Sequence, residues 1–274
     1  MWMSRAPSQP REKARLPDRM RIYAIGDIHG RADLLEKLLF QIEVDDKRHP
    51  SHHSLIVFLG DYVDRGPCSR QVLDLLVECS NARESVFLKG NHETFIPQFL
   101  DDPATLKEWR LCGGLETLAS YGLTPSISPN HREREHLATE FNKLLPVRHR
   151  EFLESLDPSF CCGDFYFVHA GIRPGIPIAR QRDEDLFWIR DDFLDWDHPF
   201  EKFIVHGHTP VHSPDIRSNR MNIDTGAFAT GCLTCVVIEG SSIASLVDVR
   251  RWPHDANTRV ISDSKTRAER ALQS

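Results

Sequence analysis

The sequence has no excess of positive charge and no long hydrophobic run. Its 34 lysine and arginine residues are outnumbered by 40 aspartate and glutamate residues, giving a formal net charge of −6. Nucleic-acid-binding domains usually carry a basic patch, so we expect no nucleic-acid partner. No apolar stretch approaches the roughly 18 residues that a membrane-spanning helix needs, so we expect no membrane partner either.

The cysteines are too scattered for a disulfide framework or a cysteine zinc site. There are seven, an odd number, and Cys232 and Cys235 form a CxxC spacing without a second pair to complete a zinc site. The first 20 residues lack the apolar segment of a secretory signal. We therefore expect reduced thiols and a cytoplasmic protein. We assign residues 1–20 to a disordered tail, 21–254 to one catalytic domain and 255–274 to a second tail.

What the sequence does contain is a repeated pattern in which a short apolar run is followed by glycine and polar residues. The first three runs are 21–25, 55–59 and 85–88, with amphipathic helices expected at 32–44 and from Ser69. Strand–helix–strand alternation predicts parallel strands, whose carboxyl ends lie together at one edge of a sheet. The polar residues that follow these runs are Asp27, His29, Asp61, Asp64, Arg65, Asn91 and His92.

Two later runs extend the pattern. The run 165–168 ends at His169, and 203–205 precedes His206 and His208, while Arg190 follows a large apolar cluster. Several of these residues have ordinary structural alternatives. Asp64 could be a surface cap, Asn91 a helix N-cap, His169 a core histidine, and His206 a core residue or a support for a ligand. Convergence at one sheet edge favours a functional site over these separate explanations.

Carboxylate, amide and imidazole groups together suit manganese, iron or zinc better than calcium. Six candidates from five segments are too many for one divalent ion. A pair of ions about 3.5–4 Å apart, bridged by one carboxylate, fits better. We expect two divalent ions, with manganese favoured over iron or zinc, and these candidate ligands: Asp27, His29, Asp61, Asn91, His169 and His208.

The other polar residues suit phosphoryl chemistry. Arg65 and Arg190 can bind phosphate oxygens through bidentate guanidinium contacts, and Asn91 is a further candidate for a phosphate contact. His92 can donate a proton to the leaving oxygen as general acid. Asp64 can orient His92 and favour its protonated form.

The remaining segments predict the frame of the site. Residues 94–156 are expected to form a mainly helical insert, with an apolar stripe of Trp109, Leu111, Leu115 and Leu118. Gly113 and Gly114 interrupt this stripe, which indicates close approach to another backbone or to a substrate. Residues 159–168 predict a hairpin, and the final strands are expected to be antiparallel. The fold class is therefore mixed α/β.

The motifs resemble those of the calcineurin-like metallophosphoesterases, and among them the phosphoprotein phosphatase branch with its bacterial and phage serine/threonine phosphatases, such as the lambda phosphatase. The resemblance covers about 21–239 and is carried by 26–30, 60–66, 90–93, 169–171, 207–210 and 224–226. It implies a four-layer, two-sheet sandwich flanked by helices. It also implies a first metal at Asp27, His29 and Asp61, and a second at Asp61, Asn91, His169 and His208.

Two departures from the wider family stand out. Pro210 occupies a position where many members of the superfamily carry a second histidine, and Arg190 matches only through a loose Trp-x-Arg context. We expect a metal-dependent phosphomonoester hydrolase, a serine/threonine protein phosphatase acting on a phosphorylated protein or peptide. The alternatives are a symmetrical dinucleoside tetraphosphatase and a metal-binding scaffold without activity. Asp64 beside His92 favours the protein phosphatase, because a serine leaving group needs protonation. The oligomeric state is not indicated.

Overall fold

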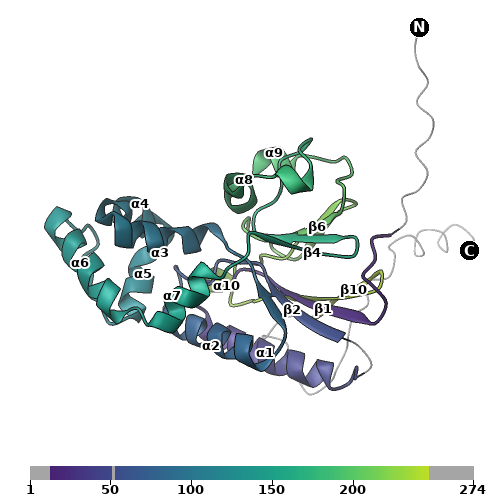
Figure 1. Cartoon of the computed structure of the whole chain (residues 1–274), viewed down its shortest axis with the longest axis horizontal. Helices are drawn as coiled ribbons and strands as arrows, with labels where there is room; N and C mark the ends of the chain where they lie inside the picture. The colour runs from purple at the N-terminus through teal and green to yellow at the C-terminus, as the bar shows by residue number, and fades with distance from the viewer. Residues whose placement is uncertain (1–12, 51–52, 247–274) are drawn as a thin grey trace, which may run out of the picture.

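A computed structural model describes residues 13–50 and 53–246 and contains two five-stranded sheets (Figure 1). In the first sheet, β1 (Met20–Ile25) is parallel to β2 (His53–Phe58), and β2 is parallel to β3 (Ser85–Phe87). At the other edge, β9 (Cys235–Glu239) runs antiparallel to β1 and to β10 (Ser242–Leu246). Both the parallel strands and the antiparallel end were predicted and are confirmed. The strands lie in the order β10, β9, β1, β2 and β3.

The second sheet begins with the predicted antiparallel hairpin, continues with parallel strands and ends with a short antiparallel strand at its other edge. Its order is β4 (Ser159–Cys162), β5 (Phe165–Val168), β6 (Phe203–His206), β8 (Arg220–Asn222) and β7 (Asp215–Ile216). Buried side chains of the two sheets pack in one cluster, in which Val57 of the first sheet joins Phe167 and Val205 of the second. The sheets therefore form a sandwich.

Helices cover both outer faces of this sandwich, so the four-layer α/β fold predicted from the sequence is confirmed. In Figure 1, α1 (Ala32–Asp46) and α2 (Ser69–Ala82) lie beneath the first sheet. Leu35 of α1 and Leu73 of α2 belong to the core cluster between these helices and the sheet. Above the second sheet lie α8 (Asp183–Trp188) and α9 (Asp191–Leu194), packed on it through Phe193. A short helix, α10 (Ala227–Thr230), follows β8.

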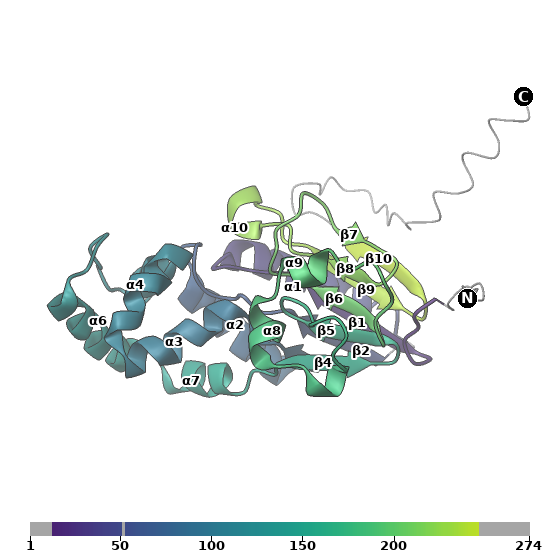
Figure 2. The same cartoon turned by 90° about the horizontal axis from the view of Figure 1, so that it is seen from above.

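The elements between β3 and β4 are all helical, and Figure 2 shows them projecting beyond the sheets. They are α3 (Asn91–Asp101), α4 (Leu106–Trp109), α5 (Gly114–Ser120), α6 (His131–Leu144) and α7 (Val147–Glu154), with 3-10 turns at Pro103–Thr105 and Arg110–Cys112. The prediction that Leu111 belongs to a buried apolar stripe is wrong. Leu111 is 75% exposed, because the 3-10 turn Arg110–Cys112 interrupts the α-helical periodicity from which the stripe was predicted.

The boundary of the first tail also needs correction. Leu16 is 1% exposed and belongs to the core between the sheets. Its amide donates to the carbonyl of Gly240, and the amide of Arg15 donates to the Asp164 carboxylate. Residues 14–16 therefore pack on the sandwich, because Leu16 reaches its core and Ala14 packs against the same cluster. Residues 1–12 and 255–274 of the two predicted tails lie outside the described residues.

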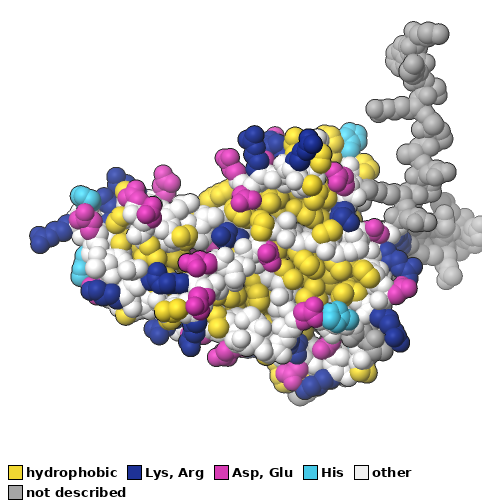
Figure 3. Space-filling model, in the orientation of Figure 1, with side chains coloured by type: hydrophobic (Ala, Val, Ile, Leu, Met, Phe, Trp, Pro, Cys, Tyr) yellow, Lys and Arg dark blue, Asp and Glu magenta, His cyan; other side chains and the backbone are white. Residues whose placement is uncertain are grey.

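The described helices include none that is long and apolar enough to cross a membrane. Acidic and basic side chains are interspersed over the face shown in Figure 3, without a dominant patch of one sign.

A buried polar relay joins the helical region to the first sheet's helices. His149 of α7 is fully buried, and its Nδ1 lies 2.7 Å from the Tyr121 hydroxyl. Its Nε2 lies 2.9 Å from a carboxylate oxygen of Asp74 in α2. These contacts fit a neutral ring that accepts from the tyrosine and donates to the carboxylate. Burial, opposed by Asp74, lowers the pKa of His149.

We expect His149→Gln to lower the free energy of unfolding by about 1–3 kcal/mol near neutral pH, because Tyr121 and Asp74 lose their buried partner. The loss should be smaller at about pH 5.5 than at about pH 7.5. At the lower pH, His149 of the native protein binds a proton when the chain unfolds but not in the folded state, so the native protein itself becomes less stable, whereas the variant lacks this effect. Urea unfolding at both pH values tests this, with the exposed His198→Gln as control. A loss that grows on acidification would contradict the neutral ring.

Candidate active site

The loops after the strands contain strained backbone at the positions where the polar residues gather. Positive φ angles outside glycine are uncommon, and they concentrate at functional sites where surrounding contacts compensate the strain. Among the described non-glycine residues, only Arg19 has a positive φ away from the site. The others are all predicted site residues: His29, Asp61, Asp64, Arg65 and His208.

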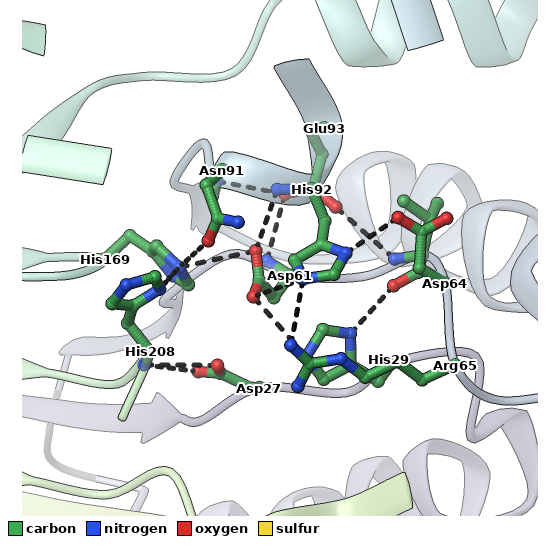
Figure 4. Close-up of polar contacts among 12 residues, drawn as sticks. Asp27, His29, Asp61, Asp64, Arg65, Asn91, His92, Glu93, His169 and His208 are labelled. Carbon is green, nitrogen blue, oxygen red and sulfur yellow. Dashed lines mark hydrogen bonds and ion pairs between the residues drawn. The ribbon is translucent and has the colours of Figure 1, made fainter. Parts of the chain in front are cut away.

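Asp61 lies at the centre of the site and is 1% exposed (Figure 4). Its carboxylate oxygens lie 3.4 Å from His29 Nε2 and 3.3 Å from His169 Nε2. One oxygen also accepts a hydrogen bond from the His92 amide at 3.2 Å. Burial opposes ionisation, but the neighbouring histidines, among them His92 with its raised pKa, outweigh it and hold the pKa of Asp61 well below its ordinary value. An ionised carboxylate at this position can bridge two cations.

Two groups of side chains could each hold a metal ion, and Asp61 belongs to both. One group is His29, Asp61 and His92, and the other is Asp61, His169 and His208. The buried Nε2 atoms of His29 and His208 have no hydrogen-bond partner among the residues that the structure describes, which is unusual for buried polar atoms. Burial lowers the pKa of His29 to about 3 and that of His208 to about 2. Neutral imidazoles are the form that binds metals, so these residues fit a pair of divalent ions.

Asp27 extends the cluster of buried negative charge. Its carboxylate accepts from the His208 amide at 3.1 and 3.3 Å, although it belongs to neither three-residue group. Burial, together with the nearby carboxylates of Asp224 and Asp61, raises the pKa of Asp27. Sequence reasoning placed Asp224 in a matching motif but did not assign it to the site. Three buried carboxylates this close together need cations to balance them, which again fits bound metal.

Asn91 is the first residue of α3 and not its N-cap, which is Gly90. Its side-chain oxygen lies 3.0 Å from His169 Nε2, so the N-cap alternative is wrong. The core alternative for His206 is supported instead. That residue is fully buried, and its ring lies edge-on to Phe193 at 4.9 Å.

His92 and Asp64 form a close pair. His92 Nδ1 lies 2.7 Å from Asp64 Oδ2, and both residues are buried. Asp64 also accepts from Trp109 Nε1 at 2.8 Å and from the Thr117 hydroxyl at 2.6 Å. It is therefore not a surface cap. Burial lowers the pKa of His92, but Asp61 and Asp64 outweigh it, and the net shift is upward. A protonated imidazole held in this way can act as a general acid.

The two arginines lie at the rim of the site. Arg65 Nη2 lies 3.2 Å from His92 Nε2, and its guanidinium lies over the Phe228 ring at 5.0 Å. A Cβ on Gly113 would lie 2.5 Å from the Arg65 amide nitrogen, which confirms the close backbone approach expected there. Arg190 is exposed, and its Nη1 donates to the Thr209 hydroxyl at 3.2 Å, next to His208.

Glu93 supports the loop that carries Asp61, a role that sequence reasoning missed. Its carboxylate accepts from the amides of Asp61, Tyr62 and Val63 at 2.9, 2.8 and 3.3 Å, and from that of Gly90 at 2.9 Å. Burial raises the pKa of Glu93 to about 7, but the four amides bind its ionised form. The signal available in the sequence was an acidic residue three positions after a glycine N-cap, a capping-box spacing.

We expect Glu93→Gln to lower the free energy of unfolding by about 1–3 kcal/mol, because the side-chain amide cannot accept all four hydrogen bonds. It should also lower kcat, since the Asp61 loop loses its anchor. Urea unfolding and hydrolysis of p-nitrophenyl phosphate measure the two effects. The exposed Glu116→Gln is the matched control. Unfolding and kcat equal to those of the control would show that Glu93 does not hold the loop.

A family model described as calcineurin-like phosphoesterase matches residues 20–228. The chain belongs to this family. The site assembled above is accordingly that of a metallophosphoesterase hydrolase, with side chains suited to a pair of metal ions at the strand ends.

Two curated relatives of this chain share the name of one activity. PrpE of Bacillus cereus strain Q1, named an asymmetrical bis(5'-nucleosyl)-tetraphosphatase, is 30% identical over 235 residues, which are 78% of this chain and 89% of the relative. PrpE of Anoxybacillus flavithermus has the same name and is 29% identical over 234 residues, 77% of this chain and 88% of its own.

Among solved structures, a putative diadenosine tetraphosphatase superposes with a TM-score of 0.59 at 20% identity and covers 87% of this chain and 100% of its own. A protein serine/threonine phosphatase from Saccharomyces cerevisiae superposes with a TM-score of 0.51 at 16% identity, covering 88% and 83%. At these identities the likenesses show a common fold and do not distinguish between the two activities.

Proposed function

We propose that this protein hydrolyses bis(5'-nucleosyl) tetraphosphates asymmetrically, into a nucleoside triphosphate and a nucleoside monophosphate. The observation that carries the proposal is the similarity, over most of both chains, to relatives with that name. The sequence motifs alone favoured a serine/threonine phosphatase, with a symmetrical tetraphosphatase as alternative. The relatives support the tetraphosphatase class, but with the asymmetrical reaction.

The site residues have distinct roles in such a reaction. Asp61, His29, His169 and His208, with Asp27 and Asn91 beside them, would hold two divalent ions. When bound, these ions supply a nucleophile from water near neutral pH and neutralise charge on the phosphoryl group.

The chain's own side chains act on the other groups. Arg65 and Arg190 bind phosphoryl oxygens and orient the substrate. His92, held by Asp64, donates a proton from Nε2 to the leaving oxygen, because its Nδ1 is engaged with that carboxylate. The Trp109 and Thr117 hydrogen bonds fix Asp64, and therefore the direction of the imidazole.

A second candidate is hydrolysis of phosphoserine or phosphothreonine in proteins. The observation that favours it is the His92–Asp64 pair, with the pKa of His92 raised. A serine alkoxide is a poor leaving group and gains more from protonation than a triphosphate does. A well-oriented general acid is therefore more valuable in a protein phosphatase.

Steady-state kinetics on one enzyme preparation, with one metal and one pH, separates these candidates. Diadenosine tetraphosphate is compared with phosphoserine and phosphothreonine peptides by kcat/KM, and the nucleotide products are resolved by chromatography. We expect the dinucleotide to be preferred and to yield ATP and AMP in equal amounts. Two molecules of ADP would indicate symmetrical cleavage, and a preference for phosphopeptides would establish the second candidate instead.

A further inference from the structure

A pocket of about 370 Å³ lies beside the active site and shares one wall with it. The shared residue is Trp188, whose ring lies edge-on to His208 at 6.4 Å and to Phe95 at 6.0 Å. Trp188 is 42% exposed, although it is a large aromatic side chain next to a buried site. The pocket is lined by Arg173, Arg182, Glu184, Asp185, Trp188 and Ile189.

The charges in this pocket divide into a satisfied pair and a free pair. The Arg173 guanidinium contacts Asp185 at 2.8 and 2.5 Å and Asp192 at 2.8 Å, so its charge is balanced within the protein. The side chains of Arg182 and Glu184 have no hydrogen-bond or ion-pair partner among the described residues. The pocket therefore offers one cation, one hydrogen-bond-accepting anion and one partly exposed aromatic side chain to a ligand.

We propose that this pocket binds the nucleoside of the leaving triphosphate, with its base stacked on Trp188. The inference rests on the proposed function and specifies the substrate contacts of the same site. A base has an aromatic face for the indole, which stacks on any base. Its ribose hydroxyls can donate to Glu184, and its phosphates can reach Arg182 on the way from the metal site. A pocket built only for phosphate would not be lined by a free carboxylate as well as an arginine.

Phe228 lies at the opposite end of the site and has a different role. Its ring lies 5.6 Å from His29, edge-on, and beneath the Arg65 guanidinium. It therefore positions a phosphate-binding arginine, and its loss should weaken binding of any phosphate. Trp188 has no such arginine above it in the described contacts, so its loss should weaken binding of nucleotides more than binding of inorganic phosphate.

The test compares two inhibitors of p-nitrophenyl phosphate hydrolysis, ATP and inorganic phosphate, at fixed free Mn²⁺. The quantity is the ratio of the two inhibition constants, in which general effects of a substitution on the site cancel. We expect Trp188→Leu to raise the ratio of ATP to phosphate about tenfold, within the range for loss of one stacking contact. The ratio in Trp188→Phe should stay close to the native value, because phenylalanine can still stack on a base. Arg182→Gln should raise the ratio less than Trp188→Leu does. Phe40→Leu, an exposed aromatic on α1, is the control that should not change it.

Each outcome decides either the pocket or the proposed function. An unchanged ratio in Trp188→Leu overturns the nucleoside subsite. A Trp188-dependent ratio in an enzyme that does not cleave diadenosine tetraphosphate leaves the subsite standing and refutes the proposed function. If affinity for a phosphopeptide with basic flanking residues depends on Trp188 while affinity for ATP does not, the pocket binds peptide and the nucleoside assignment is wrong. Calorimetric titration of the same variants with ATP gives a readout independent of turnover.

Discussion

Replacing His92 by asparagine is expected to lower kcat by about 10²–10⁴-fold, the range for loss of a general acid. The imidazole is oriented by Asp64 at 2.7 Å, and its pKa is raised by Asp61 and Asp64 despite burial. Asparagine fills similar space but cannot donate a proton of comparable acidity. The measurement is kcat on a substrate series with increasingly poor leaving groups, and the deficit should grow along that series.

The same variant separates two roles that the geometry allows for His92, general acid and metal ligand. The ligand role is possible because His92 belongs to the group with His29 and Asp61. A general acid would leave the metal content of His92→Asn close to that of the native protein, whereas a ligand would not. The exposed His198→Asn serves as control. A full kcat on the substrate with the poorest leaving group would show that His92 is not the acid.

The strand ends were predictable because their signal is local. A buried apolar run followed by glycine and polar residues identifies a strand and the loop after it, as for Val57 before Asp61. Parallel pairing then brings the loops together, because β1, β2 and β3 run in the same direction. These two steps place most of the candidate site without any knowledge of long-range contacts.

The contacts that hold the site in place were not predictable, because they join segments far apart in the chain. Trp109 was expected to be a stripe residue, and its ring is indeed buried, but its Nε1 donates to Asp64. Thr117 has no pattern that indicates its hydrogen bond to the same carboxylate. The pocket beside Trp188 likewise depends on how the loop around Arg173 folds against α8.

Chelation of divalent metal is expected to abolish hydrolysis of p-nitrophenyl phosphate, and Mn²⁺ should restore it better than Mg²⁺. Mg²⁺ prefers oxygen ligands and keeps its water, whereas the groups around Asp61 are rich in imidazole. The Nε2 atoms of His29 and His208, unpartnered among the described residues, belong to the two ligand groups, and the buried carboxylates of Asp27 and Asp224 add negative charge that bound cations would balance. The measurement is activity against added metal after dialysis with chelator.

Asp61→Asn should show the same loss without chelator, because the amide offers one neutral oxygen where an ionised carboxylate belongs to both ligand groups. Metal content measured by elemental analysis should fall together with kcat, which distinguishes this variant from His92→Asn. Asp197→Asn, at an exposed position, should keep both. Full activity in excess chelator, with no metal found by elemental analysis, would contradict a metal-dependent reaction and would leave the buried carboxylates unexplained.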